Sequence, residues 1–462
     1  MASWPGEAYA AGMAWRIVIA GGGFGGLYAA RGLERLLPAQ SARITLVNDV
    51  NFMLYTPLLP GAAAGTLEPR HVVVPLREEL ERTDLRLGRV TGARPEQRCL
   101  MVKTLEGHSE AIEYDHLVVA LGSVSRTLPI PGLAQHAIGF KTLSEAIALR
   151  NRVVLSLEMA ETLEDPEARA AYLSFVFVGG GYSGVEGLAE LQDFAADVIE
   201  QYPRCRLQGM RWMLVEAAER PMMEVPPSLS DFTMRELRRR GIEFRVGHTL
   251  EQVTDRSATL STGEVVPTRT VVWTAGVKPH PIVGRLGLPL TDKGRIQVDE
   301  LMQVAGHDHV WAIGDAAAVP DPARPGQPCP PTAQHALRQG RTVARNVAAS
   351  IGGGRKRPFR YRTLGVFVDL GRHQAVAQTL FVRWSGFPAW FLARTYHMLA
   401  MPGVKRRLRL IVDWTVDLLF ARDASELGQL GHPPSLEQES PQALIEQSAG
   451  GTRGTEPART GA

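Results

Sequence analysis

The sequence predicts an α/β fold in which one strand–turn–helix–strand unit occurs twice. In each copy an apolar strand runs into a glycine-rich turn, and a helix and a second strand follow. The copies read RIVIAGGGFGGLYAARGLERLL with ARITLVND, and LSFVFVGGGYSGVEGLAELQDFAADVIEQY with MRWMLVEA. Three further apolar runs, HLVVALG, TVVWTAG and HVWAIGD, are typical of buried parallel strands. We therefore expect parallel sheets whose strand ends face a ligand crevice.

Both turns carry glycines in the spacing G-x-G-x-x-G, between the end of a strand and the start of a helix. The first glycine allows a tight turn, the second lets the backbone approach a pyrophosphate, and the third lets the helix pack closely. One such match is compatible with a tight turn alone, but two in this context favour nucleotide binding. We interpret the chain as containing two Rossmann-like dinucleotide-binding domains, with fingerprints at Gly21, Gly23 and Gly26 and at Gly179, Gly181 and Gly184.

Polar residues stand where the second strand of each unit ends. Glu216 is in this position in the second unit, where a carboxylate accepts hydrogen bonds from a ribose and repels a 2′-phosphate. This predicts a preference for NADH over NADPH, which the nearby Arg220 weakens. In the first unit the equivalent residue is Asn48, next to Asp49, so the ribose carboxylate is missing or displaced by one residue.

Later strand ends add candidate cofactor contacts. HVWAIGD places Asp315 directly after Gly314, where a carboxylate can bind ribose or ribityl hydroxyls and the neighbouring N–H groups can face a pyrophosphate. A Gly-Asp pair by itself is more often a plain turn. Gly122 and Gly276 end the runs VVALG and VVWTAG, and we expect both to contact a cofactor at the same strand ends.

Composition excludes several classes of protein. The chain has 462 residues, of which 45% are hydrophobic and 21% charged, and this suits two or three folded domains. Its 51 basic and 48 acidic residues leave a net charge of +3, too small to imply a nucleic-acid surface. The three cysteines, Cys99, Cys205 and Cys329, are too far apart for a redox dithiol motif, and we expect them to be inert. The histidines have no metal-ligand spacing, so no metal site is predicted.

The C-terminal part of the chain has a different composition. From residue 361 tryptophans become frequent, and residues 381–422 carry seven basic and two acidic residues among Trp, Phe and Leu. This favours a helix that lies on an anionic membrane surface, since the longest uncharged run contains two prolines and cannot span a bilayer. The alternative is an amphipathic helix packed on the protein or in a homodimer interface. We expect a peripheral protein on the cytoplasmic face, with a disordered tail from about residue 426.

The fingerprints, Asp315 and the runs VVALG and VVWTAGV together resemble the two-dinucleotide-domain flavoproteins over residues 15–349. The resemblance implies FAD in the first domain and NADH or NADPH in an inserted second domain. The expected divisions are an FAD domain in two parts (15–140 and 278–360), an NADH domain (141–277), a C-terminal membrane or dimer module (361–425) and the tail (426–462).

Four segments are similar to the type II NADH dehydrogenases, which are single-subunit, non-pumping NADH:quinone oxidoreductases, and extend the resemblance to about Arg422. They are FMLYTPLLPGAAAGTLEPR, GGGYSGVE, PPTAQHALRQG and the basic, tryptophan-bearing C-terminus. The resemblance implies that Pro57 and Leu58 lie beside the isoalloxazine and that Glu186 lies near nicotinamide and flavin. The alternative for Glu186 is a carboxylate in the first turn of a helix, stabilised by the helix dipole.

The segment AQHALRQG resembles the quinone-side motif of that family, in which two glutamines line the site. Gln334 is retained, whereas Arg338 stands one helical turn later in place of the second glutamine. The alternative is that Arg338 pairs with a surface carboxylate. The implied function is hydride transfer from NADH to FAD and electron transfer to a membrane quinone, without proton pumping. A reductase of a soluble acceptor such as ferredoxin, and a redox sensor similar to apoptosis-inducing factor, stay open.

Overall fold

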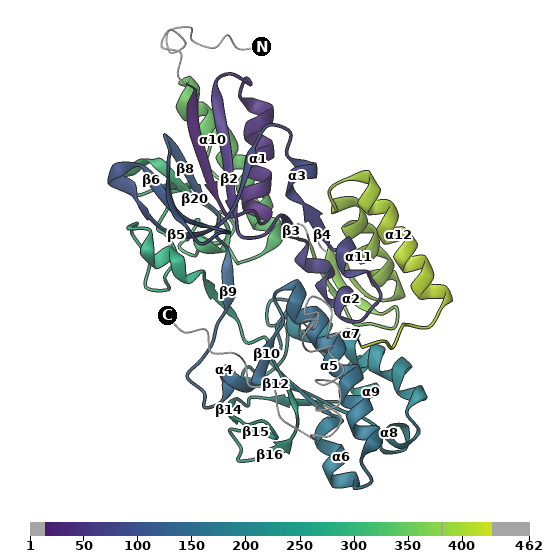
Figure 1. The fold of residues 1–462 in the computed structure, drawn as a ribbon. Coiled ribbons are helices and arrows are strands. Elements are labelled where there is room, and N and C mark those ends of the chain that lie inside the picture. The colour runs from purple at the N-terminus through teal and green to yellow at the C-terminus, as the bar shows by residue number, and fades with distance from the viewer. Residues whose placement is uncertain (1–13, 364, 380–381, 427–462) are drawn as a thin grey trace, which may run out of the picture. The chain divides into compact units, whose positions relative to one another are not determined.

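The computed structural model describes residues 14–363, 365–379 and 382–426, which Figure 1 colours along the chain. The described residues up to Ala424 form one compact unit, and a second unit begins at Ser425. All but the first residue of the tail predicted to be disordered, 426–462, lies outside the described residues.

The first sheet has eight strands in the order β19-β20-β8-β1-β2-β5-β6-β7. Its centre is parallel, because β1 pairs with β2 and β8, β2 with β5, and β8 with β20. The strands come from two separate stretches of the chain: β1 (Trp15–Ala20), β2 (Ala42–Asn48), β5 (Asp84–Arg94), β6 (Cys99–Thr104), β7 (Ser109–Glu113) and β8 (His116–Val119), then β19 (Gln303–Val304) and β20 (His307–Ala312). This confirms the predicted α/β fold.

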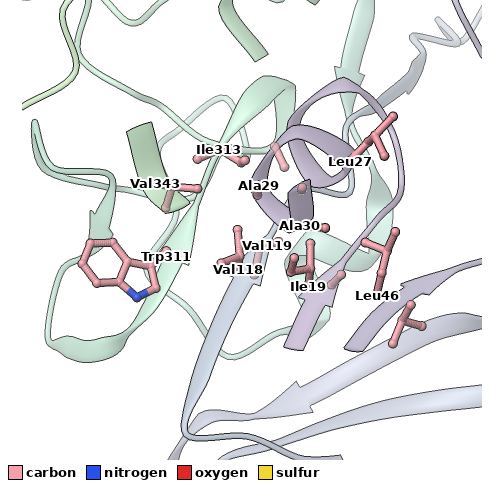
Figure 2. Packing of buried hydrophobic residues seen from close by; sticks show 14 of the residues in the cluster. Ile19, Leu27, Ala29, Ala30, Leu46, Val118, Val119, Trp311, Ile313 and Val343 are labelled. Atoms are coloured by element: carbon pink, nitrogen blue, oxygen red, sulfur yellow. The ribbon is translucent and has the colours of Figure 1, made fainter. Parts of the chain in front are cut away.

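The core of the first sheet explains its apolar sequence runs. Helices α1 (Phe24–Leu36) and α10 (Ala333–Gly352) pack side by side on it. In Figure 2, Ile19, Val118 and Trp311 from three neighbouring strands lie against Leu27 of α1 and Val343 of α10, and all five side chains are fully buried. A strand buried in this way needs apolar residues in succession, which is why these segments show no alternating pattern.

The second sheet is wholly parallel and has the order β10-β17-β11-β12-β13. It contains the second glycine unit, and Phe175 stacks on Trp212 in its core with the ring centroids 4.6 Å apart. Its strands are β10 (Ala137–Gly139), β11 (Ser174–Val178), β12 (Arg211–Glu216), β13 (Ile242–Val246) and β17 (Thr270–Trp273). The helices of this region are α4 (Leu133–His136), α5 (Leu143–Thr162), α6 (Pro166–Tyr172), α7 (Tyr182–Val198), α8 (Pro203–Gln208) and α9 (Pro227–Arg239).

Short strands, helices and 3-10 turns form the segments that connect the strands of the two large sheets. The sheet β9-β18 joins Ser123–Ser125 to Val277–Pro279, and an antiparallel sheet consists of β14 (Leu250–Val253), β15 (Ser257–Leu260) and β16 (Val265–Pro267). After the first unit come β3 (Phe52–Leu54), the 3-10 turn η2 (Thr56–Leu58), α2 (Leu59–Ala63), η3 (Pro69–His71), β4 (Val73–Pro75) and α3 (Leu76–Glu79). The remaining 3-10 turns are η4 (Pro95–Gln97), η5 (Ile199–Gln201), η6 (Pro281–Arg285) and η7 (Gly314–Ala316).

The C-terminal part is an antiparallel sheet followed by two helices. The strands are β21 (Gly365–Asp369), β22 (Ala375–Thr379) and β23 (Val382–Gly386), and the helices are α11 (Phe387–Ala400) and α12 (Val404–Leu419). Among the described residues, no helix combines the length and the apolar character needed to cross a bilayer.

The charge count of residues 381–422 overstated the basic surface of this part. Arg406 is 6% exposed and pairs with Glu78 and Glu79 of α3. Arg422 pairs with Asp193, at 2.6 Å between Nη2 and Oδ2. These two guanidinium groups tie the C-terminal part to the rest of the unit, because buried charges need partners. Their contribution to the predicted surface charge is therefore cancelled inside the protein.

Candidate active site

One cavity, called here the main cavity because several of the predicted residues line it, lies at the carboxyl ends of the first sheet's parallel strands. It has a volume of about 430 Å³. Its wall brings together predicted residues from across the sequence: Gly21, Gly23, Asn48, Gly122, Glu186, Gly314 and Asp315. Convergence of several strand ends at one crevice is what a doubly wound sheet provides for a ligand.

The first glycine turn is shaped for a phosphate-bearing ligand. Gly21 has φ +105°, and a Cβ at Gly26 would collide with the carbonyl oxygen of Gly21. A Cβ at Gly23 would meet no atom within 4 Å, so that position faces open space in the cavity. Helix α1 begins at this point with no side chain capping its N–H groups. Uncapped N–H groups and the positive end of the helix dipole suit a pyrophosphate.

A hydrogen-bonded chain of three side chains also lines the main cavity. Ser123 Oγ donates to Asp315 Oδ2 at 2.6 Å, and Lys141 Nζ donates to Ser123 Oγ at 2.9 Å. Burial lowers the pKa of Lys141, and Asp315 partly opposes this shift. Behind the wall, the Gly314 N–H donates to Gln339 Oε1 at 2.7 Å, which fixes the turn that presents Asp315. The sequence did not single out Ser123 and Lys141, although each follows a predicted or observed strand, β8 or β10, within four residues.

The second glycine turn repeats the first. Gly179 has φ +111°, a Cβ at Gly184 would collide with the Gly179 carbonyl oxygen, and a Cβ at Gly181 would meet nothing within 4 Å. Helix α7 also begins without a side-chain cap. These glycines do not line the main cavity, and neither do Glu216 and Gly276, although Val277 and Ser183 do.

The Glu216 carboxylate already holds its own turn together. Oε2 accepts the Gly180 N–H, and Oε1 accepts the Ala218 N–H at 2.8 Å. Arg220 donates to the carbonyl oxygens of Met222 and Val225, both at 3.1 Å. The Arg220 guanidinium group is therefore bound to carbonyl oxygens of its own loop. It does not pair with the Glu216 carboxylate.

Glu186 lies in the second turn of α7, since the helix begins at Tyr182 and has no acidic residue in its first turn. The alternative interpretation, a carboxylate in the first turn, is therefore wrong. Its Oε1 accepts the Asp369 N–H at 3.1 Å. Burial raises the pKa of Glu186 well above its ordinary value; the hydrogen bond from the Asp369 N–H lowers it in part, and the charges of Asp369 and Glu190 raise it. Glu186 lines both the main cavity and a neighbouring one, called here the inner cavity, of about 30 Å³.

The loop expected beside the isoalloxazine contributes to both cavities. Thr56, Leu59 and Pro60 line the main cavity, whereas Pro57 and Leu58 line the inner cavity. The alternation arises because residues 56–63 form the turn η2 and then α2, whose successive side chains point in different directions. The loop singled out by the resemblance therefore lines both cavities, but Pro57 and Leu58 themselves line only the inner one.

Gln334 and Arg338 lie near the site without lining either cavity. Gln334 Nε2 donates to the Gly365 carbonyl oxygen at 3.1 Å, and its Oε1 accepts from Tyr361 at 2.6 Å. The Arg338 guanidinium carbon lies 4.1 Å from the centroid of the Tyr361 ring, and Nη1 donates to the Gln334 carbonyl oxygen. In the described part of the chain, Arg338 thus stacks on a tyrosine instead of pairing with a surface carboxylate.

The three cysteines are buried free thiols and take no part in the main cavity. Burial raises the pKa of Cys205 to about 12 and that of Cys329 to about 11, so both are protonated thiols at neutral pH. Within the described residues, no group of three or more His, Cys, Asp or Glu is placed to hold a metal ion.

Comparison with known proteins identifies the class that this fold and site define. A family model of pyridine nucleotide-disulphide oxidoreductases matches residues 15–340, and the chain belongs to that family. Although the family name refers to a disulphide, the cysteines of this chain are free and do not line the main cavity.

Relatives place the chain more narrowly. It is 30% identical over 426 residues to a type II NADH:quinone oxidoreductase of Mycobacterium tuberculosis, covering 88% of this chain and 89% of that one. It is also 30% identical to a demethylphylloquinone reductase of Synechocystis, covering 86% and 95%. A solved structure of NDH2 from Plasmodium falciparum in complex with NADH shares the fold with TM-score 0.82, 18% identity, and coverage of 89% and 100%. The resemblance to type II NADH dehydrogenases, with FAD as cofactor and NADH as donor, is confirmed.

Proposed function

We propose that this chain oxidises NADH and reduces a membrane quinone, with FAD held in the main cavity. The observation that carries the proposal is the convergence of an open, uncapped glycine turn and the Asp315–Ser123–Lys141 chain on one cavity. FAD, when bound, accepts a hydride from NADH and passes electrons to an acceptor. The empty space beside Gly23 and the uncapped start of α1 fit its pyrophosphate, and Asp315 fits its hydroxyl groups.

The second glycine turn is proposed to hold NADH. Gly181 leaves the same open space as Gly23, and Glu216 supplies the carboxylate for a ribose. Glu186 stands between the two nucleotide positions, because it lies on the helix that begins at the second turn and lines the main cavity. A carboxyl group with a raised pKa at this place can hold a proton at neutral pH. These residue roles, Gly276 and Gly122 at the strand ends, and the domain divisions at residues 140, 277 and 360 stay predictions.

On the acceptor side, Gln334 and Arg338 are proposed to act through the strand that they support. Gln334 binds the carbonyl oxygen of Gly365, the first residue of β21, and Phe367 and Asp369 of the same strand line the inner cavity. The pair therefore positions one wall of the region that a quinone must approach. Pro57 and Leu58 line the same cavity.

The experiment that tests the function is a steady-state assay of the purified FAD-loaded protein. NADH oxidation is followed with a benzoquinone, a naphthoquinone and a ferredoxin as separate acceptors. Rapid turnover with a quinone is the expected result. A chain that turns over only with ferredoxin would be a soluble-acceptor reductase, and negligible turnover with every acceptor would indicate the redox-sensor alternative; both outcomes overturn the proposal.

Helices α11 and α12 are proposed to bind the surface of the membrane. They expose large apolar side chains, among them Phe391 (61%), Leu408 (58%) and Leu419 (71%). Lys405 and Arg409, on α12, are exposed as well. Apolar side chains that enter the interface, together with cations that meet anionic headgroups, are what a peripheral helix requires. The proposed location is therefore the cytoplasmic face of the membrane, and a homodimer interface is the competing use of the same surface.

Co-sedimentation with vesicles containing an anionic phospholipid tests this part. The double variant Leu408→Glu with Val412→Glu should lose binding, because two charges would enter the apolar surface of α12. Leu207→Glu is the matched control, since Leu207 is 86% exposed on α8 and lies outside the proposed surface. Equal binding of both variants would refute membrane docking, and conversion of a dimer to a monomer by the double variant would assign the surface to the homodimer.

A further inference from the structure

Lys141 brings a positive charge into the main cavity. Its side chain lines that cavity, and its ammonium group donates a hydrogen bond to Ser123 Oγ at 2.9 Å. Within the described residues, no carboxylate lies at ion-pair distance from the ammonium group. Among the described residues that line the cavity, Lys141 is also the one lysine or arginine. The proposed function places FAD in this cavity, and the role of Lys141 rests on that placement.

The two carboxylates whose charges act on Lys141 are both engaged with other groups. Asp315 Oδ2 accepts the Ser123 hydroxyl at 2.6 Å. Glu145 Oε2 accepts the backbone N–H groups of Lys141 and Thr142, both at 2.8 Å, in the capping box that begins α5. Burial lowers the pKa of Lys141, and the charges of Asp315 and Glu145 offset only part of that shift. A negative charge in the cavity would therefore stabilise the ammonium form.

The neighbours of Lys141 indicate which end of the cavity it lines. The residue does not belong to the glycine turn at Gly23 that fits a pyrophosphate, but follows β10, a strand of the second sheet. Phe140, directly before it, also lines the cavity, and a Cβ at Gly187 would meet the Phe140 ring at 2.7 Å. Gly187 follows Glu186 on α7. Lys141 therefore enters the cavity from the side that α7 lines, where the isoalloxazine and nicotinamide are expected.

A cation at this end of the cavity affects the oxidised and the reduced cofactor differently. Hydride transfer from NADH to the neutral isoalloxazine ring of FAD adds two electrons and one proton, and therefore one negative charge. A positive charge held in a cavity of low dielectric constant stabilises the negatively charged state more than the neutral one. It therefore favours reduction. The carboxyl groups of Glu186 and Asp315, which line the same cavity, have no positive charge with which to do this.

We propose that Lys141 raises the reduction potential of the bound flavin by holding its ammonium group where negative charge develops on reduction. Ser123 is the positioning residue, because its oxygen accepts from Lys141 while its proton goes to Asp315. The role of Lys141 is electrostatic. Its ammonium group forms no covalent bond and gives up no proton, so hydride transfer from NADH balances without a further reactant.

An anaerobic equilibrium titration of the FAD-loaded protein against a reference dye of known potential tests the proposal. Lys141→Met removes the charge and keeps a long side chain. At a fixed potential its ratio of reduced to oxidised flavin should be about 10-fold lower than in wild type, equivalent to about 30 mV for two electrons. Lys141→Arg retains the charge and should restore most of the ratio. Lys103→Met is the matched control, because Lys103 is exposed on β6, and it should titrate as wild type.

The affinity for oxidised FAD separates this role from binding of the pyrophosphate. The oxidised ring is neutral, so Lys141→Met should change the dissociation constant of oxidised FAD by less than about 3-fold. Fluorescence titration of the FAD-free protein measures it. A wild-type ratio of reduced to oxidised flavin in Lys141→Met would overturn the proposal. Loss of FAD from both Lys141→Met and Lys141→Gln would assign the charge to the pyrophosphate and overturn it equally.

Failure of the proposed function would be recognised separately. Retention of FAD by Gly23→Val would overturn the placement of FAD in the main cavity, whatever the Lys141 variants show. Failure of the wild type to reduce any quinone would overturn the proposed acceptor and would leave the potential of the flavin measurable.

Discussion

The first glycine turn, Gly21 to Gly26, and the second, Gly179 to Gly184, use the same backbone geometry but meet side chains of different charge. In the first, Asn48 Oδ1 accepts the Gly22 N–H at 2.7 Å, and its Nδ2 donates to the Val50 carbonyl oxygen. In the second, Glu216 accepts the equivalent N–H of Gly180 and a further one from Ala218.

The comparison separates two roles of the residue that ends the second strand of each unit. Its side-chain oxygen holds the glycine turn in both copies, and an amide or a carboxylate serves equally well for that. The charge is therefore free to differ, and only the second copy places a carboxylate where a ribose is expected. Absence of a carboxylate at Asn48 thus leaves the first turn intact as a nucleotide site.

The largest effects are expected from filling the open position of either turn. Gly23→Val should abolish retention of FAD, whereas Gly181→Val should retain FAD but prevent its reduction by NADH. Both chains should fold, because a Cβ at either glycine meets no protein atom within 4 Å. Flavin absorbance, thermal midpoint and anaerobic titration with NADH measure the three properties. Loss of FAD from both variants would show that the turns are not separate sites.

Gly26→Ala and Gly184→Ala provide the contrast that isolates ligand contact from packing. A Cβ at either position collides with a backbone carbonyl oxygen of its own turn. Compared as FAD-free proteins, so that loss of the bound cofactor does not contribute, these variants should have a lower thermal midpoint than wild type, which the valine variants should not. Equal midpoints across all four would contradict the division of roles among the glycines.

The second effect concerns the charge at the end of the second unit. Glu216→Gln should lower the preference for NADH over NADPH about 10-fold in kcat/KM, equivalent to about 1.4 kcal/mol, because repulsion of the 2′-phosphate is removed. Asn48→Asp is the control in the first unit. It should leave the nucleotide preference unchanged while weakening the strand end, since aspartate cannot donate to the Val50 carbonyl oxygen. Equal use of both nucleotides by the wild type would show the Glu216 assignment wrong.

The third effect concerns Glu186. This residue lies on α7, the helix that follows the second glycine turn, but it lines the main cavity beside the first glycine turn. Its pKa is raised in the folded protein, so the folded state binds more protons than the unfolded state at pH values above the ordinary 4.5. The contribution of Glu186 to the free energy of unfolding is fully present below that ordinary pKa. It falls as the pH rises, by at most about 1.4 kcal/mol per pH unit. Glu186→Gln, which retains an oxygen for the Asp369 N–H, should therefore gain stability relative to wild type as pH rises.

Thermal midpoints of the FAD-loaded proteins between pH 5 and 8 measure this difference. The gap between Glu186→Gln and wild type should widen toward pH 8. The exposed control Glu200→Gln should follow the wild-type curve. Parallel curves for wild type and Glu186→Gln would show that burial does not raise the pKa of the Glu186 carboxyl group.

How much could be predicted from the sequence depends on how local each feature is. The glycine turns were predicted together with the strands and helices on either side, because strand, turn and helix are adjacent in the chain. Each glycine is required by the backbone geometry of its own turn. The Asp315–Ser123–Lys141 chain was not, because its members come from three strand ends that only the assembled fold brings together. Sequence marked Asp315 alone.

Charge was the feature that sequence described least well. Arg406 and Arg422 count as surface charge in a linear reading, yet both pair with carboxylates supplied by segments far away in the chain. Glu190 likewise looks like an ordinary helix residue in the sequence, and only the folded chain shows that it lines two cavities. Ion pairs and cavities are properties of the tertiary packing, so a one-dimensional pattern does not contain them.

The smallest effect is expected from Arg338. This residue lines neither cavity and is proposed to support the acceptor side only through other residues. Arg338 stacks on Tyr361 and donates to the Gln334 carbonyl oxygen, while Gln334 holds the start of β21. Arg338→Ala should therefore slow quinone reduction only about 3-fold, which is the loss of one moderate cation–π contact. Flavin reduction by NADH should be unchanged, because no Arg338 contact reaches the second turn.

Arg341→Ala is the matched control for Arg338→Ala. Both arginines lie on α10 and stack on a tyrosine, but Arg341 stacks on Tyr28 of α1, with 5.0 Å from its guanidinium carbon to the ring centroid. Its loss should leave both half-reactions unchanged. If the two variants reoxidise with a quinone at the same rate and retain equal FAD, Arg338 has no acceptor-side role. Slower reoxidation in Arg338→Ala alone would indicate that Arg338 acts by supporting β21, since its side chain lines neither cavity.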